Sequence, residues 1–140
     1  MVTAIVGVVI LVLIGALIFA VARDPGPSPD EVALGYEEAW DRLDFTALWD
    51  LAGDELRDGL GRTEFVAAKR KAYADQPDLG GLAANVALEH RAVDGPAATV
   101  ETRVELRDGT VARNEVQLTK RTGRWVVVGY QLRSTNPPGH

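Results

Sequence analysis

Hydrophobic residues follow three successive patterns along this chain. Residues 2–22 are apolar without interruption except at Thr3. From residue 29 to residue 76, apolar residues recur every three or four positions, which is the spacing of one buried helix face. From Asn85 onward, apolar and polar residues alternate, which is the spacing of half-buried strands. The pattern therefore predicts an apolar segment, then a helical part, then a sheet.

The apolar segment is long enough to cross a bilayer. A helix of 21 residues, at about 1.5 Å per residue, spans the roughly 30 Å hydrocarbon core. The rival interpretation is a cleaved signal peptide, because Ala20-Val21-Ala22 matches a cleavage site. The run is longer than a signal-peptide core, and no Lys or Arg precedes it. We therefore predict a single-pass transmembrane helix at 1–22, which contacts membrane lipid through residues 2–22.

The sequence contains few charges from which to predict the side of the membrane on which the domain lies. Arg23 follows the apolar segment directly, whereas no basic residue precedes it. The positive-inside rule then favours a cytoplasmic domain by a narrow margin. Twelve Arg against three Lys is a composition typical of a high-GC bacterium.

A proline-rich linker separates the apolar segment from the first helix. Residues 23–28 contain two prolines and a glycine, which cannot continue the preceding helix. Ser28 is placed to cap a new helix that begins at Pro29, and Glu31 would complete the capping box. The domain is therefore expected to begin at residue 29.

Two further capping signals divide the helical part into three helices. Asp44 can cap a second, short helix that Gly53 ends. Thr63 can cap a third helix, which must end before Pro77.

Three turn signals divide the second half into four strands. They are Asp94-Gly95-Pro96, Asp108-Gly109 and Thr122-Gly123. The last strand, Arg124 to Leu132, is apolar on both faces, which predicts a central or doubly covered strand. Residues 134–140, with two prolines and a glycine, are predicted to form a disordered tail.

The register of the two middle strands follows from the length of their loop. A two-residue loop at Asp108-Gly109 would place Val104 opposite Arg113, whereas a three-residue loop at 108–110 keeps one face apolar. We therefore predict the longer loop, with Gly109 at positive φ. The paired residues would be Val100 with Leu118, Thr102 with Val116, Arg103 with Glu115, and Glu105 with Arg113.

Three short motifs resemble those of one fold superfamily. They are Tyr36-Glu37-Glu38-Ala39-Trp40, the stretch from Leu43 to Trp49, and Gly123-Arg124-Trp125-Val126-Val127. Residues 29–133 resemble the nuclear-transport-factor-2-like superfamily, also called cystatin-like or ketosteroid-isomerase-like. The resemblance implies an α+β fold in which three helices pack on a curved four-stranded antiparallel sheet, forming a cone. Within this superfamily, the chain resembles short bacterial membrane or envelope proteins of unknown function.

Composition excludes several kinds of chemistry. The chain has no cysteine, which excludes disulfides, thiolate catalysis and cysteine metal sites. Its net charge is −5, and no Lys/Arg cluster with interleaved aromatics appears, so nucleic-acid binding is not expected. Two histidines 50 residues apart make no metal ligand set. No cofactor motif is present, and the oligomeric state is left open.

The resemblance places an Asp or Tyr inside the cone in the superfamily's enzymes. Here the positions predicted to face inward carry no acid or base: Val100, Thr102, Val104, Leu106, Val116 and Leu118, with Asn114 towards one end. His90 is predicted on the apolar side of its strand, and pairing it with Glu37 or Asp41 gives the one acid/base site that can be drawn. The alternatives are a histidine at the core edge bonded to backbone, or an exposed one.

Five aromatic residues are candidates for lining a pocket in the cone: Tyr36, Trp40, Trp49, Tyr73 and Tyr130. The alternative is that they are ordinary core residues. The favoured function is a membrane-anchored, non-catalytic binding or assembly module, with a protein partner or a small apolar ligand. The second hypothesis is a small isomerase, cyclase or hydrolase of the ketosteroid-isomerase type. An inward carboxylate beside an open cavity favours the enzyme, and a filled cone favours the module.

Overall fold

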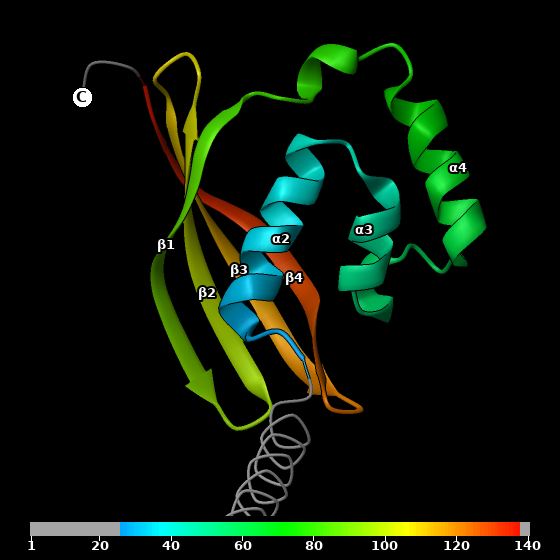
Figure 1. Cartoon of the computed structure of the whole chain (residues 1–140), viewed down its shortest axis with the longest axis vertical. Coiled ribbons are helices and arrows are strands. Elements are labelled where there is room, and N and C mark those ends of the chain that lie inside the picture. Colours follow the sequence, from blue (N-terminus) through cyan, green and yellow to red (C-terminus); the bar gives the residue numbers. More distant parts are fainter. Residues whose placement is uncertain (1–25, 138–140) are drawn as a thin grey trace, which may run out of the picture.

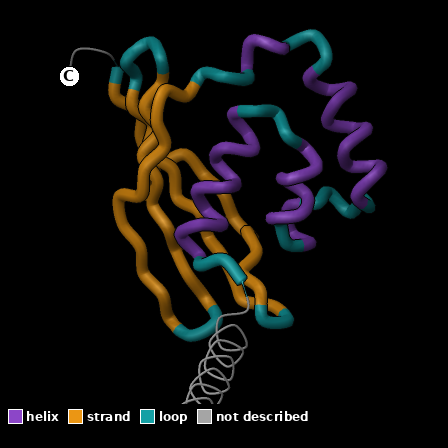
Figure 2. The backbone as a smooth tube through the Cα atoms, viewed as in Figure 1, coloured by secondary structure: helices purple, strands orange, loops and turns teal. Residues whose placement is uncertain are grey.

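The computed structural model describes residues 26–137, which form a two-layer α+β domain. Figures 1 and 2 show the helices on one face of a strongly bent antiparallel sheet. The predicted arrangement of three helices on a curved four-stranded sheet is confirmed. The elements are α2 (Pro29–Asp41), α3 (Phe45–Leu51), the 3₁₀-helix η1 (Asp54–Leu56), α4 (Arg62–Tyr73), the 3₁₀-helix η2 (Pro77–Leu79), β1 (Ala83–Asp94), β2 (Ala97–Leu106), β3 (Val111–Arg121) and β4 (Arg124–Asn136).

The predicted transmembrane helix at 1–22 lies outside the described residues. Between residues 26 and 137, no helix is both long enough and apolar enough to cross a membrane.

Two of the three predicted helix caps form as expected. The Ser28 hydroxyl accepts a hydrogen bond from the Glu31 amide at 3.2 Å, and the Asp44 carboxylate accepts one from the Ala47 amide at 3.1 Å. The third cap was predicted wrongly, because α4 begins at Arg62 after Gly61. Thr63 therefore lies within the first turn of α4 instead of before it.

The sheet is a simple meander in the order β1-β2-β3-β4. Between β2 and β3 the loop has three residues, as predicted, but it spans 107–109, and Gly109 has φ of 90°. The Asp108 carboxylate accepts a hydrogen bond from the Thr110 amide at 2.8 Å. Thr110 is thereby held against Leu106 at the end of the ladder, instead of lying in the loop.

This one-residue difference moves each cross-strand partner by two positions. Val100 lies opposite Val116, Thr102 opposite Asn114, Arg103 opposite Arg113, and Glu105 opposite Val111. The predicted charge pairs across these strands are therefore wrong. A shift of two preserves which face each residue occupies, because side chains alternate with period two. The predicted inward positions on β2 and β3 are consequently the buried ones, apart from the half-buried Leu106: Val100, Thr102, Val104, Asn114, Val116 and Leu118.

β4 is an edge strand, so the first of the two predicted alternatives, a central strand, is wrong. Its apolar pattern reflects a bulge: Leu118 lies opposite Val127 and Gln117 opposite Gly129, which leaves Val128 unpaired. The extra residue reverses the alternation, so Val127 before it and Tyr130 after it point to the same face.

The outer edge of β4 is partly covered. The Gly53 amide donates a hydrogen bond to the Val127 carbonyl at 2.7 Å, and Ala52 forms a parallel bridge with Val127. β4 also continues to Asn136, past the predicted boundary at residue 133, because the start of β3 supplies its partners. Part of the tail predicted at 134–140 is thus strand, and residues 138–140 lie outside the described part.

Candidate functional site

An open pocket of about 320 Å³ lies between the end of α2 and the sheet. It is found where Figure 1 shows η2 and the β2–β3 turn, at the end of the domain where α2 finishes. Most of its lining is apolar or aromatic, and two carboxylates also contribute. The lining residues are Glu37, Trp40, Asp41, Leu43, Tyr73, Leu79, Leu82, Ala83, Val104, Leu106, Ala112, Asn114 and Tyr130.

The inner wall of the pocket is built around the buried carboxylate of Glu37. This residue lies on α2 and is 5% exposed. Its Oε1 accepts hydrogen bonds from Thr102 Oγ1 at 2.9 Å and from Asn114 Nδ2 at 3.0 Å. Its Oε2 accepts one from the Tyr130 hydroxyl at 2.8 Å. Three strands of the sheet therefore hold one side chain of the helix layer.

Tyr130 links this network to the core beneath it. Burial, and next the charge of Glu37, raise the pKa of Tyr130 far above its ordinary value, so its hydroxyl remains a donor. Asn114 Nδ2 also donates to this hydroxyl, at 3.1 Å. On the core side, Tyr36 packs edge-on against the Tyr130 ring with centroids 5.2 Å apart, and burial raises the pKa of Tyr36 as well.

Asp41 provides the second carboxylate of the pocket, at the last turn of α2. Its Oδ1 accepts a hydrogen bond from the Ala83 amide at 2.9 Å, which ties the end of α2 to the start of β1. Its backbone carbonyl accepts a further bond from Gly81 at 2.6 Å. These two bonds hold the end of α2 against the segment that joins η2 to β1.

The structure brings together five of the eight residues singled out from the sequence. Glu37, Asp41, Trp40, Tyr73 and Tyr130 all line the pocket. Trp40 and Tyr73 also pack against each other, with ring centroids 6.1 Å apart. Tyr36 lies beneath the pocket, and the other two residues lie elsewhere.

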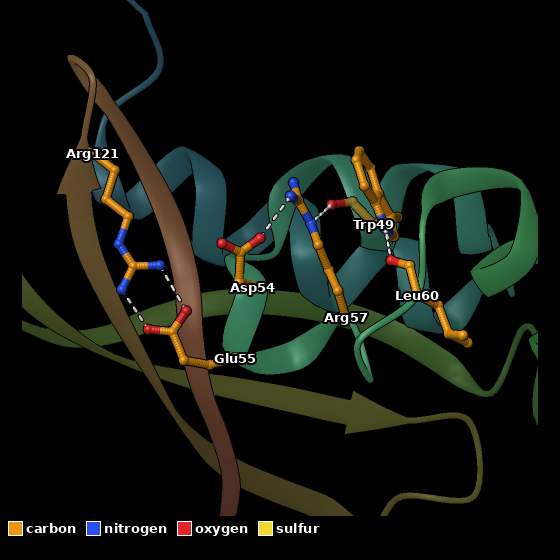
Figure 3. Close-up of polar contacts among 6 residues, drawn as sticks. All are labelled: Trp49, Asp54, Glu55, Arg57, Leu60 and Arg121. Atoms are coloured by element: carbon orange, nitrogen blue, oxygen red, sulfur yellow. Dashed lines mark hydrogen bonds and ion pairs between the residues drawn. The ribbon is translucent and has the colours of Figure 1, made fainter.

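Trp49 belongs to a separate cluster that positions η1, as Figure 3 shows. Its indole Nε1 donates to the Leu60 carbonyl at 3.2 Å, and the Arg57 guanidinium lies 3.6 Å from its ring centroid. Arg57 also donates to the Trp49 carbonyl and to Asp54. This cluster stabilises the connection from α3 to α4 and does not contribute to the pocket.

His90 lies on the far side of the sheet from the pocket. A bulge between Leu88 and His90 shifts the register of β1, so His90 is exposed and opposite Glu101. Glu101 neighbours the inward-facing Thr102, so both His90 and Glu101 point away from the helices. The acid/base pair drawn from the sequence, His90 with Glu37 or Asp41, is therefore not assembled. Among residues 26–137, no group of three or more His, Asp or Glu could hold a metal ion.

Sequence reasoning missed the residues that leave the pocket open. Ala112 lies opposite Val104 on the inward face of the sheet, and Ala83 lies opposite Leu106. Their short side chains leave space that Val or Leu would fill. The alternating pattern around Ala112 was a usable signal, but the pattern does not distinguish a packed alanine from one beside a cavity.

Comparisons with known proteins give matches only at the level of structure. No protein-family model matches the sequence, and no curated protein matches it. A protein from Campylobacter jejuni, provisionally described as an NTF2-like transpeptidase, superposes with a TM-score of 0.55 at 14% identity, covering 72% of this chain and 97% of its own. A SEC-C motif protein from Rhodopseudomonas palustris gives 0.55 at 19% identity, covering 76% and 80%.

A third structure is an NTF2-like protein of unknown function from Shewanella oneidensis. It superposes with a TM-score of 0.52 at 26% identity, covering 73% of this chain and 93% of its own. These likenesses concern the fold and carry no activity to this chain. With its three helices on a bent four-stranded meander, the chain has the nuclear-transport-factor-2-like fold that its sequence motifs predicted.

Proposed function

We propose that this chain is a membrane-anchored, non-catalytic binding module whose pocket takes a small, largely apolar molecule. The observation that carries the proposal is the pocket of about 320 Å³, lined by Trp40, Tyr73, Tyr130 and several leucines. Its volume falls within the range of small-molecule sites, and its lining is of the type that such sites use. Leu79 and Leu82 are each 45% exposed, so the apolar surface continues to the pocket mouth.

The hydrogen bonds of Glu37 support binding over catalysis. A general base needs a lone pair directed at the proton that it removes. Both oxygens of Glu37 are already engaged by donors from the protein, namely Thr102, Asn114 and Tyr130. The carboxylate therefore serves to join helix and sheet at the wall of the pocket.

The test is binding of a neutral, water-soluble apolar probe, cyclohexylmethanol. The full chain in lipid nanodiscs is titrated calorimetrically, with protein-free nanodiscs as the blank. Ala112→Phe should abolish binding, because a ring at this position enters the pocket. Ala92→Phe is the matched control, because Ala92 is exposed on β1 outside the pocket. Absence of binding to the folded parent, or equal binding by the Ala112→Phe variant, would refute the proposal.

A second candidate function is an isomerase of the ketosteroid-isomerase type. One observation favours it: Glu37 is an inward-facing carboxylate on the wall of an open cavity. Such an enzyme would move a proton from the α-carbon of a β,γ-unsaturated ketone to its γ-carbon, giving the conjugated enone. Ultraviolet absorbance follows this reaction with cyclohex-3-enone as substrate. Turnover by the parent that is lost in Glu37→Gln, with unchanged thermal stability, would favour the enzyme.

The membrane anchor and its orientation form part of the proposal. Residues 2–22 support a transmembrane helix, and Arg23 supports a cytoplasmic domain. The chain has no cysteine, so Ser134→Cys introduces a single thiol at an exposed position of β4. A membrane-impermeant thiol reagent should label this variant only after lysis. Labelling in sealed, intact cells would place the domain outside.

A further inference from the structure

We propose that the pocket selects a cation: a small molecule with an apolar body and an ammonium group. This inference rests on the proposed binding function and specifies the class of ligand. It follows from the sign and placement of the charges around the pocket. Two carboxylates, Glu37 and Asp41, line the pocket, whereas none of its lining residues is Lys or Arg.

The first argument is the lack of a counter-charge for Glu37. Buried carboxylates are normally paired with a cationic side chain. Glu37 is 5% exposed, yet its partners Thr102, Asn114 and Tyr130 are all neutral. Within residues 26–137, no Lys or Arg forms a salt bridge with it. The negative charge therefore acts on the pocket without local neutralisation.

Three basic residues close to the pocket make contacts outside it. Lys69 lies 6.0 Å from the centroid of the Trp40 ring, and its ammonium is paired with Asp58 at 3.5 Å. Arg42, next to Asp41, lies 4.0 Å from Glu38 on the same helix and lines a different hollow. Arg107 follows the last residue of β2, and its Nε donates to the Gly81 carbonyl at 2.8 Å. None of these three side chains lines the pocket, although Arg42 shares the neighbouring hollow with Asp41. Glu37 is therefore the carboxylate of the pocket that is farther from a basic side chain in the sequence.

The aromatic lining adds a second attraction for cations. Trp40, Tyr73 and Tyr130 all contribute to the pocket wall. The faces of such rings carry negative partial charge and attract ammonium groups within about 6 Å, most strongly where water is excluded. The same rings offer apolar contact to the body of the ligand. Acidic and aromatic groups in one pocket thus favour a ligand that is both cationic and apolar.

The experiment compares three water-soluble probes of nearly equal shape: cyclohexylmethylammonium, cyclohexylmethanol and cyclohexanecarboxylate. Binding to the full chain in nanodiscs is measured by calorimetry against protein-free nanodiscs. The cation should bind about tenfold more tightly than the alcohol, because a unit charge near a carboxylate in a partly dry site gains more than about 1.4 kcal/mol. The carboxylate probe should bind more weakly than the alcohol.

Asp41→Asn isolates the contribution of charge. An asparagine keeps an oxygen that can accept from the Ala83 amide, and removes the negative charge. The variant should weaken binding of the cation by about three- to tenfold more than it changes binding of the alcohol. Glu38→Gln is the matched control, because Glu38 lies on the same helix but does not line this pocket.

The outcomes separate the two proposals. Equal binding of cation and alcohol would overturn the cation preference and leave the binding function intact. An equal loss in Asp41→Asn and Glu38→Gln would show that the net charge, not this pocket, attracts the cation, and would also overturn the inference. No binding of any probe to the folded chain would overturn both proposals.

Discussion

The space between the helices and the sheet is sealed at one end of the domain and open at the other. At the closed end, Val32, Val100, Val116 and Val127 are at most 2% exposed. At the open end, Leu79 and Leu82 are 45% exposed, and Trp40 and Tyr73 are only partly buried. Both ends are lined mainly by apolar side chains. Hydrophobic composition alone therefore does not decide whether the cone is filled.

The difference arises from side-chain size and from the position of Glu37. β-branched valines from α2, β2, β3 and β4 meet at the closed end and leave no room. At the open end the inward positions include Ala83 and Ala112, whose short side chains line the pocket. Glu37 and its three donors lie at the boundary. A polar network thus separates the packed core from the pocket in the space between the helices and the sheet.

The largest expected effect on stability comes from truncating a leucine side chain at the closed end. Leu118 is 2% exposed, so Leu118→Ala should reduce the free energy of unfolding by about 2–5 kcal/mol. Leu79→Ala is the same substitution at the open end and should cost less than about 1 kcal/mol. Urea denaturation of both variants measures the difference. Equal losses would show that the two ends do not differ in packing.

Trp40→Ala should have an intermediate effect. The side chain is partly buried and packs on Tyr73, so the loss should be about 2–3 kcal/mol, below the 3–5 kcal/mol of a fully buried tryptophan. Thermal and urea unfolding provide the measurement. A loss of 4 kcal/mol or more would assign Trp40 to the closed core instead of to the pocket wall.

Tyr130→Phe tests the boundary between the ends. It leaves Glu37 Oε2 without its donor and should cost about 1–2 kcal/mol at neutral pH. The pKa of Tyr130 is higher in the folded state than in the unfolded state. The stabilisation that the protonated hydroxyl gives is therefore fully present below the ordinary pKa of 10 and is lost as the pH rises above that value.

The parent should therefore lose stability more steeply than Tyr130→Phe between about pH 9 and pH 11. Tyr36, whose pKa is also raised, should leave a residual slope in the variant. Parallel pH profiles for parent and variant would contradict the assigned role of the Tyr130 hydroxyl.

The smallest effect is expected at the surface pair of Glu55 and Arg121, shown in Figure 3. The hydrogen bond from Arg121 lowers the pKa of Glu55 to about 2, but both side chains are more than 40% exposed. Glu55→Gln should therefore cost less than about 0.5 kcal/mol, and added salt should reduce the loss further.

The ion pair between Glu55 and Arg121 adds to the free energy of unfolding at pH values above the ordinary pKa of the carboxyl. This addition is lost as the pH falls towards 2. Unfolding measured at pH 7 and pH 3 tests this dependence. A loss above 1 kcal/mol in moderate salt would show that this surface ion pair contributes to stability as much as some buried side chains do.

Local signals in the sequence were sufficient for much of the fold. The caps at Ser28 and Asp44 depend on residues three positions apart, so they could be predicted. The alternation along β2 and β3 identified the buried face despite a register error of two residues. Both of these features depend on short-range geometry.

The remaining features depend on long-range contacts. The bulge after Leu88 moved His90 to the outer face, and the bulge at Val128 produced a pattern that resembled a central strand. Glu37 was considered from the sequence, but its partners Thr102 and Tyr130 are 65 and 93 residues away. No local pattern connects such positions, and their assembly appears only when the sheet has formed.

The length of α2 sets the distance between the start of the described domain and its pocket. The helix begins at Pro29 and ends at Asp41, which lines the pocket, and its 13 residues extend about 20 Å. Figure 1 shows that α2 runs from the end of the domain where residue 26 lies to the end where η2 lies. The pocket mouth therefore lies about one helix length from the point at which residue 26 enters the domain.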